Sequence, residues 1–387
     1  MKVTLSKGCI VKTPLAALGV LTLATLSVSA CASSDGAASG DLTVKASDSA
    51  CKISATKLDA GPSTFKVTNA GSKVTEFYIY ADGDRIMGEV ENIGPGLSRN
   101  LVIDLPKGTY EGACKPGMIG DGIRQTLTVS GNGSKKLSDS EELKAAADSY
   151  ERYVKSQSDA LIIKTEEFVA AVKAGKVDEA KKLFPIARTY WERIEPVAEQ
   201  FGDLDPITDG REPDAIAEGK DFTGWHRIEK QLWVSNNTKG MDKYADQLLT
   251  NVREIVKLGQ DAPLTALELA QGSKGLLDEV ATGKITGEED EFSHTDLWDF
   301  KANIEGSQAA IAALRPVLED QDPALVKDLD AKFKLVDDEL NQHQDKATGE
   351  WTFYDELTKE QVKALSDAVA ALSEPISKVA AVVAASA

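Results

Sequence analysis

Residues 127–140, Leu-Thr-Val-Ser-Gly-Asn-Gly-Ser-Lys-Lys-Leu-Ser-Asp-Ser, separate two parts of the chain that have different hydrophobic periods. Up to Ser130, apolar residues alternate with polar ones, which is typical of strands with one buried face. After this stretch, apolar residues recur every three or four positions, as on the buried side of a helix. The sequence therefore predicts a multidomain protein in which an all-β half precedes an all-α half.

The β half, residues 41–130, is predicted to form a small antiparallel sandwich. Clusters of Gly, Pro, Asn and Asp separate the alternating runs, and these residues favour turns. The alternating apolar positions are Leu42, Val44, Ala46, Phe65, Val67, Phe77, Ile79, Leu101, Ile103, Leu105, Leu127 and Val129.

The helical half, residues 138–385, is predicted to form an antiparallel helical bundle, with two joined four-helix units as one arrangement. Residues 131–137 are the expected linker. Ser138-Asp139-Ser140-Glu141 has the composition of a capping box, in which serine and glutamate satisfy the free amides of a helix start. The apolar positions of the first helix are Leu143, Ala146, Ala147, Tyr150, Val154 and Leu161.

Residues 1–30 have the composition of a signal peptide, because a basic start precedes an apolar run, Pro14–Val28, that is short for a membrane span. Val28-Ser29-Ala30-Cys31 resembles a bacterial lipobox, which implies lipid attachment at Cys31; an unmodified cysteine after ordinary cleavage is the alternative. Residues 31–40 are expected to form a flexible tether. We expect an exported protein, lipid-anchored on the outer face of the cytoplasmic membrane, at the cell surface or in the periplasm.

The chain is strongly acidic, with 62 Asp and Glu residues against 44 Lys and Arg residues and a formal net charge of -18. Such a chain repels nucleic acid and gathers cations near its surface. The composition therefore excludes a nucleic-acid partner and favours a cationic ligand. We expect the protein to act as a monomer.

One of only three histidines lies in Gly224-Trp225-His226-Arg227-Ile228-Glu229. The spacing of His226 and Glu229 places both side chains on one face of a helix. Apolar neighbours indicate that this face is buried, where an unpartnered charge is not tolerated. The pair is therefore a candidate metal site.

Glu192 and Glu195 have the same i, i+3 spacing on an earlier helical segment, and a long polar segment, residues 201–214, follows them. Antiparallel packing would bring this pair to the histidine, with Asp209 from the polar segment, predicted as a loop, folded over the gap. Gathered carboxylates oppose one another's ionisation unless a cation is bound. Oxygen ligands with one nitrogen suit iron, manganese or zinc. For Glu192 and Glu195 the alternative is a solvated helix face.

Several sequence blocks resemble the imelysin-like domain of the EfeO-type iron-uptake lipoproteins, over about residues 138–385. The blocks are Tyr190-Trp191-Glu192-Arg193-Ile194-Glu195-Pro196, Phe201-Gly202-Asp203-Leu204-Asp205-Pro206, Gly224–Glu229 and Phe292–Phe300. The family's His-x-x-Glu motif falls on His226 and Glu229. The resemblance implies binding of ferric or ferrous iron outside the cytoplasm, delivery to a membrane permease and cooperation with a secreted haem peroxidase.

An enzymatic alternative is a metallopeptidase of the imelysin type. Zinc peptidases usually carry a second histidine four residues after the first, with a general-base glutamate between them. Here Lys230 stands at the position of the second histidine and Arg227 at that of the glutamate. We therefore expect no enzyme.

The other two histidines are not expected to bind metal. His294 lies in Ser293-His294-Thr295-Asp296, where Ser293 or Thr295 is expected to cap a helix and Asp296 to favour its dipole. His343 has polar neighbours on an expected loop and is assigned no role.

The stretch from Tyr110 to Met118, Tyr-Glu-Gly-Ala-Cys-Lys-Pro-Gly-Met, resembles the ligand loop of cupredoxins, over about residues 41–130. Glu76 falls where a cupredoxin places its first histidine. Residues 1–225 contain no histidine, which excludes an ordinary blue-copper site. Glu76, Cys114 and Met118 remain a candidate metal set, with copper or zinc as possible ions and a copper-assisted ferroxidase as a further alternative function.

Cys51 and Cys114 are the only cysteines after Cys31. In an oxidising compartment two cysteines of a small β domain most often pair. We therefore favour a Cys51–Cys114 disulfide over a metal role for Cys114.

Overall fold

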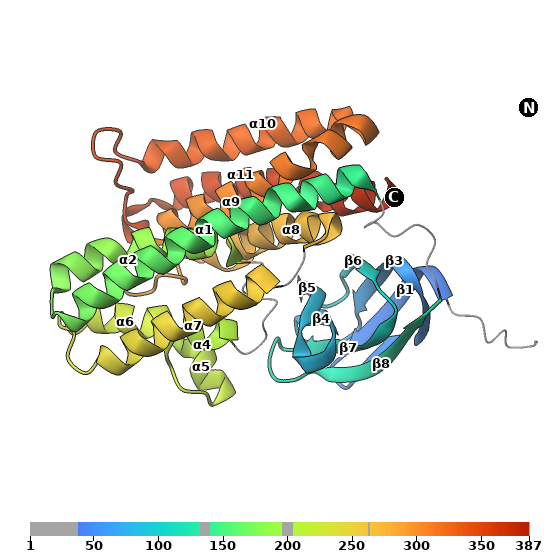
Figure 1. The fold of residues 1–387 in the computed structure, drawn as a ribbon, viewed down its shortest axis with the longest axis horizontal. Helices are drawn as coiled ribbons and strands as arrows, with labels where there is room; N and C mark the ends of the chain where they lie inside the picture. Colours follow the sequence, from blue (N-terminus) through green and yellow to red (C-terminus); the bar gives the residue numbers. More distant parts are fainter. Residues whose placement is uncertain (1–37, 132–139, 196–203, 262–263, 387) are drawn as a thin grey trace, which may run out of the picture. The chain divides into compact units, whose positions relative to one another are not determined.

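The computed structural model describes residues 38–131, 140–195, 204–261 and 264–386 (Figure 1). Strands occupy the first of these ranges and helices dominate the others, which confirms the predicted order of a β region and a helical region. The expected signal peptide and nearly all of the expected tether and linker lie outside the described residues, so those boundaries stay predictions.

The β region is one mixed sheet. Its strands are β1 (Ala38–Ser47), β2 (Ala50–Ile53), β3 (Lys57–Asn69), β4 (Thr75–Tyr80), β5 (Ile86–Ile93), β6 (Ser98–Leu105), β7 (Gly108–Pro116) and β8 (Ile123–Ser130). The order is β2-β1-β3-β8-β7-β4-β5, and β6 pairs with β3. Both β1 and β8 run parallel to β3. The prediction of a purely antiparallel sandwich is therefore wrong.

Strand β3 changes neighbours along its length. Lys57–Asp59 pairs with β8, whereas residues 61–68 pair with β6. Gly61, with a φ of 123°, and Pro62 lie at this change. Glycine adopts such a backbone without steric cost, so the strand can turn from one partner to the next.

The predicted inward positions of the β region are buried, from Leu42 in β1 to Val129 in β8. Alternation places successive side chains on opposite faces of a sheet, so the pattern identified the buried face correctly. It carries no information on strand direction.

The helical region has a large apolar core of its own. Its helices are α1 (Glu141–Lys173), α2 (Val177–Glu192), α4 (Leu204–Asp209), α5 (Glu212–Glu218), α6 (Gly224–Trp233), α7 (Asp242–Asp261), α8 (Ala266–Thr282), α9 (Asp296–Gln321), α10 (Pro323–Leu340) and α11 (Lys359–Ala385). The short 3-10 helices are η1 (Asp82–Asp84), η4 (Lys284–Thr286), η5 (Asn341–His343) and η6 (Tyr354–Glu356). The arrangement of the α-helices as an antiparallel bundle of four-helix units stays a prediction.

Two local predictions for the helical region need correction. The N-cap of α1 is Ser140, whose hydroxyl accepts a hydrogen bond from the Leu143 amide at 3.4 Å, and Ser138 lies outside the described residues. The polar segment predicted as a loop is helical from Leu204 onward, where α4 and α5 form. The six apolar positions predicted for α1 are all buried.

Helix α11 has the length and hydropathy of a membrane span. Its buried residues nevertheless recur every three or four positions, as expected for a helix that packs along one side in a protein core. They include Leu365, Val369, Leu372, Ile376, Val379 and Val383.

Candidate metal centre

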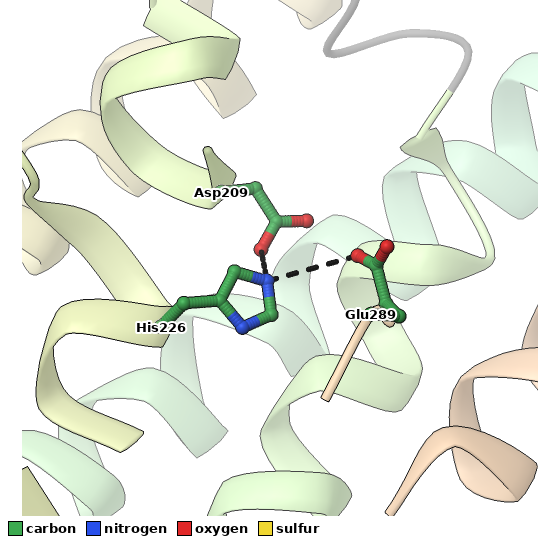
Figure 2. A group of neighbouring side chains, drawn as sticks. All are labelled: Asp209, His226 and Glu289. Atoms are coloured by element: carbon green, nitrogen blue, oxygen red, sulfur yellow. Dashed lines mark ion pairs between the residues drawn. The ribbon is translucent and has the colours of Figure 1, made fainter. Parts of the chain in front are cut away.

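His226 lies buried in α6, and its two ring nitrogens face different carboxylates. Nδ1 lies 2.9 Å from Oε2 of Glu229. Nε2 lies 3.2 Å from Oδ1 of Asp209 and 3.7 Å from Oε1 of Glu289 (Figure 2). The structure thus brings Glu229 and Asp209 to the histidine as predicted, and adds Glu289.

A close backbone contact places α6 against α4. Gly224 has a φ of 74°, and a Cβ at this residue would lie 2.0 Å from the carbonyl oxygen of Thr208. The Thr223 hydroxyl donates to the carbonyl of Ile207 at 2.6 Å. Only glycine permits this approach, and Asp209 follows Thr208 directly. The glycine two residues before His226 therefore brings the aspartate to the imidazole.

Glu229 is held from two sides. Its Oε1 accepts hydrogen bonds from the backbone amides of Phe292, at 3.0 Å, and Ser293, at 2.7 Å, while Oε2 faces Nδ1 of His226. A carboxylate fixed in this way orients the ring and favours a proton on Nδ1. In the neutral ring, the lone pair of Nε2 then faces Asp209 and Glu289.

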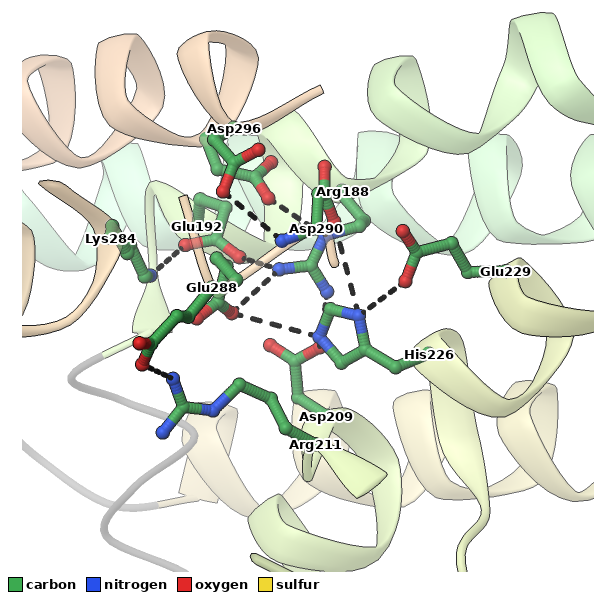
Figure 3. Close-up of polar contacts among 12 residues, drawn as sticks. Arg188, Glu192, Asp209, Arg211, His226, Glu229, Lys284, Glu288, Asp290 and Asp296 are labelled. Carbon is green, nitrogen blue, oxygen red and sulfur yellow. Dashed lines mark hydrogen bonds and ion pairs between the residues drawn. The ribbon is translucent and has the colours of Figure 1, made fainter. Parts of the chain in front are cut away.

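Arg188 of α2 is fully buried in the middle of the carboxylates (Figure 3). The guanidinium contacts Asp299 at 2.9 Å, Glu289 at 3.1 Å and Asp290 at 3.4 Å, and it also contacts Glu192 and Asp209. Sequence reasoning missed Arg188. The available signal was its position one helical turn before Glu192, on the same face of the helix.

Glu192 and Glu195 form the other end of the cluster. Together with Asp209 they offer carboxylate oxygens that all lie within 4.8 Å of one another. Lys284 of η4 lies between the two glutamates, 2.8 Å from Oε2 of Glu195 and in contact with Glu192. The Asn303 amide donates to Glu195 at 3.0 Å. Since Glu192 is fully buried and Glu195 nearly so, the alternative of a solvated helix face does not hold.

Carboxylates outnumber cations in this cluster. Among the described residues, seven buried carboxylates contact Arg188, Lys284 or His226, namely Glu192, Glu195, Asp209, Glu229, Glu289, Asp290 and Asp299, and the more exposed Glu279 also contacts Lys284. The two basic side chains and a protonated imidazole balance at most three of them. Burial of uncompensated charge is costly, so the remaining carboxyls must hold protons or a further cation.

Part of the cluster holds its protons tightly. Burial raises the pKa of Glu195 well above its usual value, and the neighbouring Glu192 adds to the effect. Burial also raises the pKa values of Asp290 and Asp299, although Arg188 opposes this. A bound cation would displace these protons.

The pKa values of Asp209 and Glu289, the two carboxyls that face Nε2 of His226, are shifted in the opposite direction. Burial disfavours their ionisation, but Arg188 and His226 lower the pKa of Asp209, and Lys284 and His226 lower that of Glu289 well below its usual value. The pKa of His226 is raised well above its usual value, because its contacts with acidic groups outweigh burial and Arg188. Ionised oxygens therefore face the imidazole.

The other histidines do not join the candidate ligand groups among the described residues. His294 has a φ of 58° and a side chain that is 40% exposed. Thr295 is the N-cap residue of α9 and Asp296 lies in its first turn, as predicted, but the Thr295 hydroxyl makes no capping bond. It lies 2.9 Å from the Ser293 hydroxyl and also contacts Asp290. His343, expected on a loop, is buried in η5.

The β region does not assemble the metal set predicted from its sequence. Cys114 of β7 forms a disulfide with Cys51 of β2. Cys114 pairs with Phe77 on the core face, whereas Glu76 precedes Phe77 in β4 and so points to the opposite face. The Glu76 carboxylate accepts a hydrogen bond from the Tyr78 hydroxyl at 3.2 Å, and Met118 lies 37% exposed after β7.

Comparison with known proteins agrees with both regions. Residues 146–379 match the imelysin family model, and residues 16–129 match that of the cupredoxin-like domain. The iron uptake system component EfeO of Escherichia coli O1:K1 / APEC is 39% identical over 340 residues, which cover 87% of this chain and 89% of that protein. Its counterparts in Escherichia coli strain K12 and Shigella flexneri are 38% identical over the same shares. The chain therefore belongs to the EfeO family, with a cupredoxin-like domain followed by an imelysin domain.

Proposed function

We propose that this protein is the extracytoplasmic iron-binding component of an uptake system, which captures ferric or ferrous iron and passes it to a membrane permease. The relatives that support this proposal are named as components of an iron uptake system. Lipid attachment at Cys31 would hold the protein at the membrane near the permease. A secreted haem peroxidase of the same system is the further proposed partner.

In this proposal the iron ligands are Asp209, Glu289 and Nε2 of His226. Their ligand atoms all lie within 4.8 Å of one another, and this convergence is the observation that carries the proposal. Two carboxylates with one imidazole suit iron, and zinc or copper can bind the same donors. Glu229 orients the ring from the other side.

Titration calorimetry with ferrous iron under anaerobic conditions tests this ligand set. His226→Ala and Asp209→Asn are each expected to weaken iron binding by about a hundredfold or more, because each removes a ligand from a small set. Asp337→Asn is the matched control, since Asp337 binds Lys301 at 2.8 Å and does not contact the cluster. Unchanged affinity in variants with native circular dichroism would remove these residues from the site.

The structure gives no support to the peptidase alternative. Lys230, at the position of a second zinc histidine, pairs with Glu212. Arg227, at the position of the general base, places its guanidinium 5.1 Å from the centre of the Tyr244 ring. A copper-assisted ferroxidase lacks support as well, because the sulfur of Cys114 is bonded to Cys51.

A further inference from the structure

Lys284 is a buried basic residue whose place in the cluster the proposed iron ligands do not explain. Its side chain is 3% exposed, and the ammonium contacts Glu192 and Glu195, which with Asp209 form a second potential cation position. Asp209 belongs to both this position and the one at His226. The ammonium therefore lies where a second set of carboxylate ligands converges.

The ammonium of Lys284 also contacts a third carboxylate, that of Glu279. Glu279, one turn from the end of α8, lies 3.4 Å from Nζ and is 22% exposed, so it is the most exposed of the three carboxylates in contact with the ammonium. The backbone is fixed here, because the Tyr354 hydroxyl donates to the carbonyl of Ile285. Because Glu279 already contacts the ammonium, Lys284 keeps a carboxylate partner if it leaves Glu192 and Glu195.

We propose that Lys284 is a tethered counter-cation that competes with iron for Glu192 and Glu195. This inference rests on the proposed function. In the iron-free protein the ammonium contacts both glutamates and offsets one negative charge there. When iron reaches Asp209, it gains Glu192 and Glu195 as ligands only if the ammonium leaves them for Glu279, because two cations at the same oxygens repel each other.

This competition sets the affinity of the site. A resident ammonium lowers the net gain from binding iron, because the contacts of Lys284 with the glutamates must be given up. When iron departs, the ammonium returns to the carboxylates and spares the protein an uncompensated buried charge. Lys284 thereby allows an acid-rich site to release its ion to a permease.

Lys284→Met tests the proposal, since methionine keeps the apolar stem and removes the charge. We expect iron affinity to rise about tenfold or more and release of iron to a chelator, followed by stopped flow, to slow by a similar factor. Glu279→Gln removes the charge of this third carboxylate and is expected to lower iron affinity and to speed release. Lys301→Met, which removes a lysine bound to Asp337, is the control and should leave both quantities unchanged.

The outcomes separate the two proposals. If wild-type protein fails to bind iron, the proposed function is wrong. If wild-type protein binds iron but Lys284→Met and Glu279→Gln match it in affinity and release rate, only the role of Lys284 is wrong. If Lys284→Met folds only with iron present, the release rate is measured on protein folded with iron, and a rate equal to or faster than that of the wild type overturns the inference.

Discussion

Gly224 and Glu229 both hold the imidazole of His226 in place, by different means. The glycine lets α6 approach the carbonyl of Thr208, and the glutamate joins Nδ1 to two backbone amides. Neither residue needs to touch the ion to matter for its binding.

Gly224→Ala is expected to destabilise the fold by more than about 3 kcal/mol, because the new Cβ would lie 2.0 Å from the Thr208 oxygen. Iron affinity should fall as well, since relief of the clash separates Asp209 from His226. Gly240→Ala is the matched control. Gly240 has a similar φ of 78° but has no atom within 4 Å of the added Cβ, so it should cost only about 1 to 2 kcal/mol. Urea unfolding of both variants checks this, and equal losses would contradict the close contact.

Glu229→Gln is expected to weaken iron binding by about 10- to 100-fold, because an amide no longer holds the imidazole through a charged hydrogen bond. The loss should be smaller than for His226→Ala, which removes a proposed ligand. Calorimetry on both variants compares them. A loss for Glu229→Gln that equals or exceeds the loss for His226→Ala would identify Glu229 as a ligand instead.

Iron-free protein is expected to lose stability as the pH rises from about 6 to 8. The raised pKa values of His226, Glu195, Asp290 and Asp299 mean that these groups bind protons more tightly in the folded state. Each therefore contributes stability that is complete below its unfolded pKa and is lost as the pH rises through its folded pKa. Asp209 and Glu289 have lowered pKa values, so their contributions change only at acidic pH.

Thermal unfolding of chelator-treated protein, followed by circular dichroism, measures this dependence. Bound iron should reduce the loss of stability at the higher pH, because the ion replaces the protons that the cluster releases. A melting temperature that rises between these two pH values in iron-free protein would show that the cluster does not titrate in this way.

At the scale of helices and strands, the sequence predicted which faces are buried more reliably than how the elements connect. Alternation identified positions such as Leu42 and Val129, and three-to-four spacing identified Leu143 and Leu161. Both patterns report burial of one side. The local pattern marks Ala60-Gly61-Pro62 only as a turn and misses that β3 continues there and changes partners. It also misses the short helix α4.

The same limit explains what the sequence could say about the candidate site. His226 and Glu229 lie within one helical turn, so spacing alone places them on one face. Glu289 and Lys284 reach the cluster from the segment after α8, and Asp299 reaches it from α9. Their approach is long-range, and no periodic signal in their own segments marks it.

Removal of the disulfide between β2 and β7 is expected to destabilise the β region selectively. The bond closes a loop of 63 residues, which corresponds to about 4 kcal/mol in the chain-entropy account. All five tryptophans lie in the helical region, so hydrogen exchange of β-region peptides is the suitable probe. Cys51→Ala with Cys114→Ala should speed exchange in β2 and β7 and leave α9 unchanged. Unchanged exchange in those strands would contradict a structural role of the bond.

On the scale of the whole molecule, the acidic residues that matter most for the proposed function are those of one buried cluster. A formal net charge of -18 costs little where the charged groups face water, but the burial of seven carboxylates with three basic groups costs much more. The cluster therefore gains stability from a bound cation. In this account, the excess of buried negative charge over buried positive charge is what favours the binding of iron.

The most direct test is a crystal of the full chain grown with iron and measured at the iron absorption edge. We expect an anomalous peak next to His226. The peak should lie about 2.0–2.4 Å from Nε2 of His226 and from one oxygen each of Asp209 and Glu289. The ammonium of Lys284 should then lie at Glu279. Iron bound elsewhere in the chain, with the helical cluster free of anomalous density, would contradict the account.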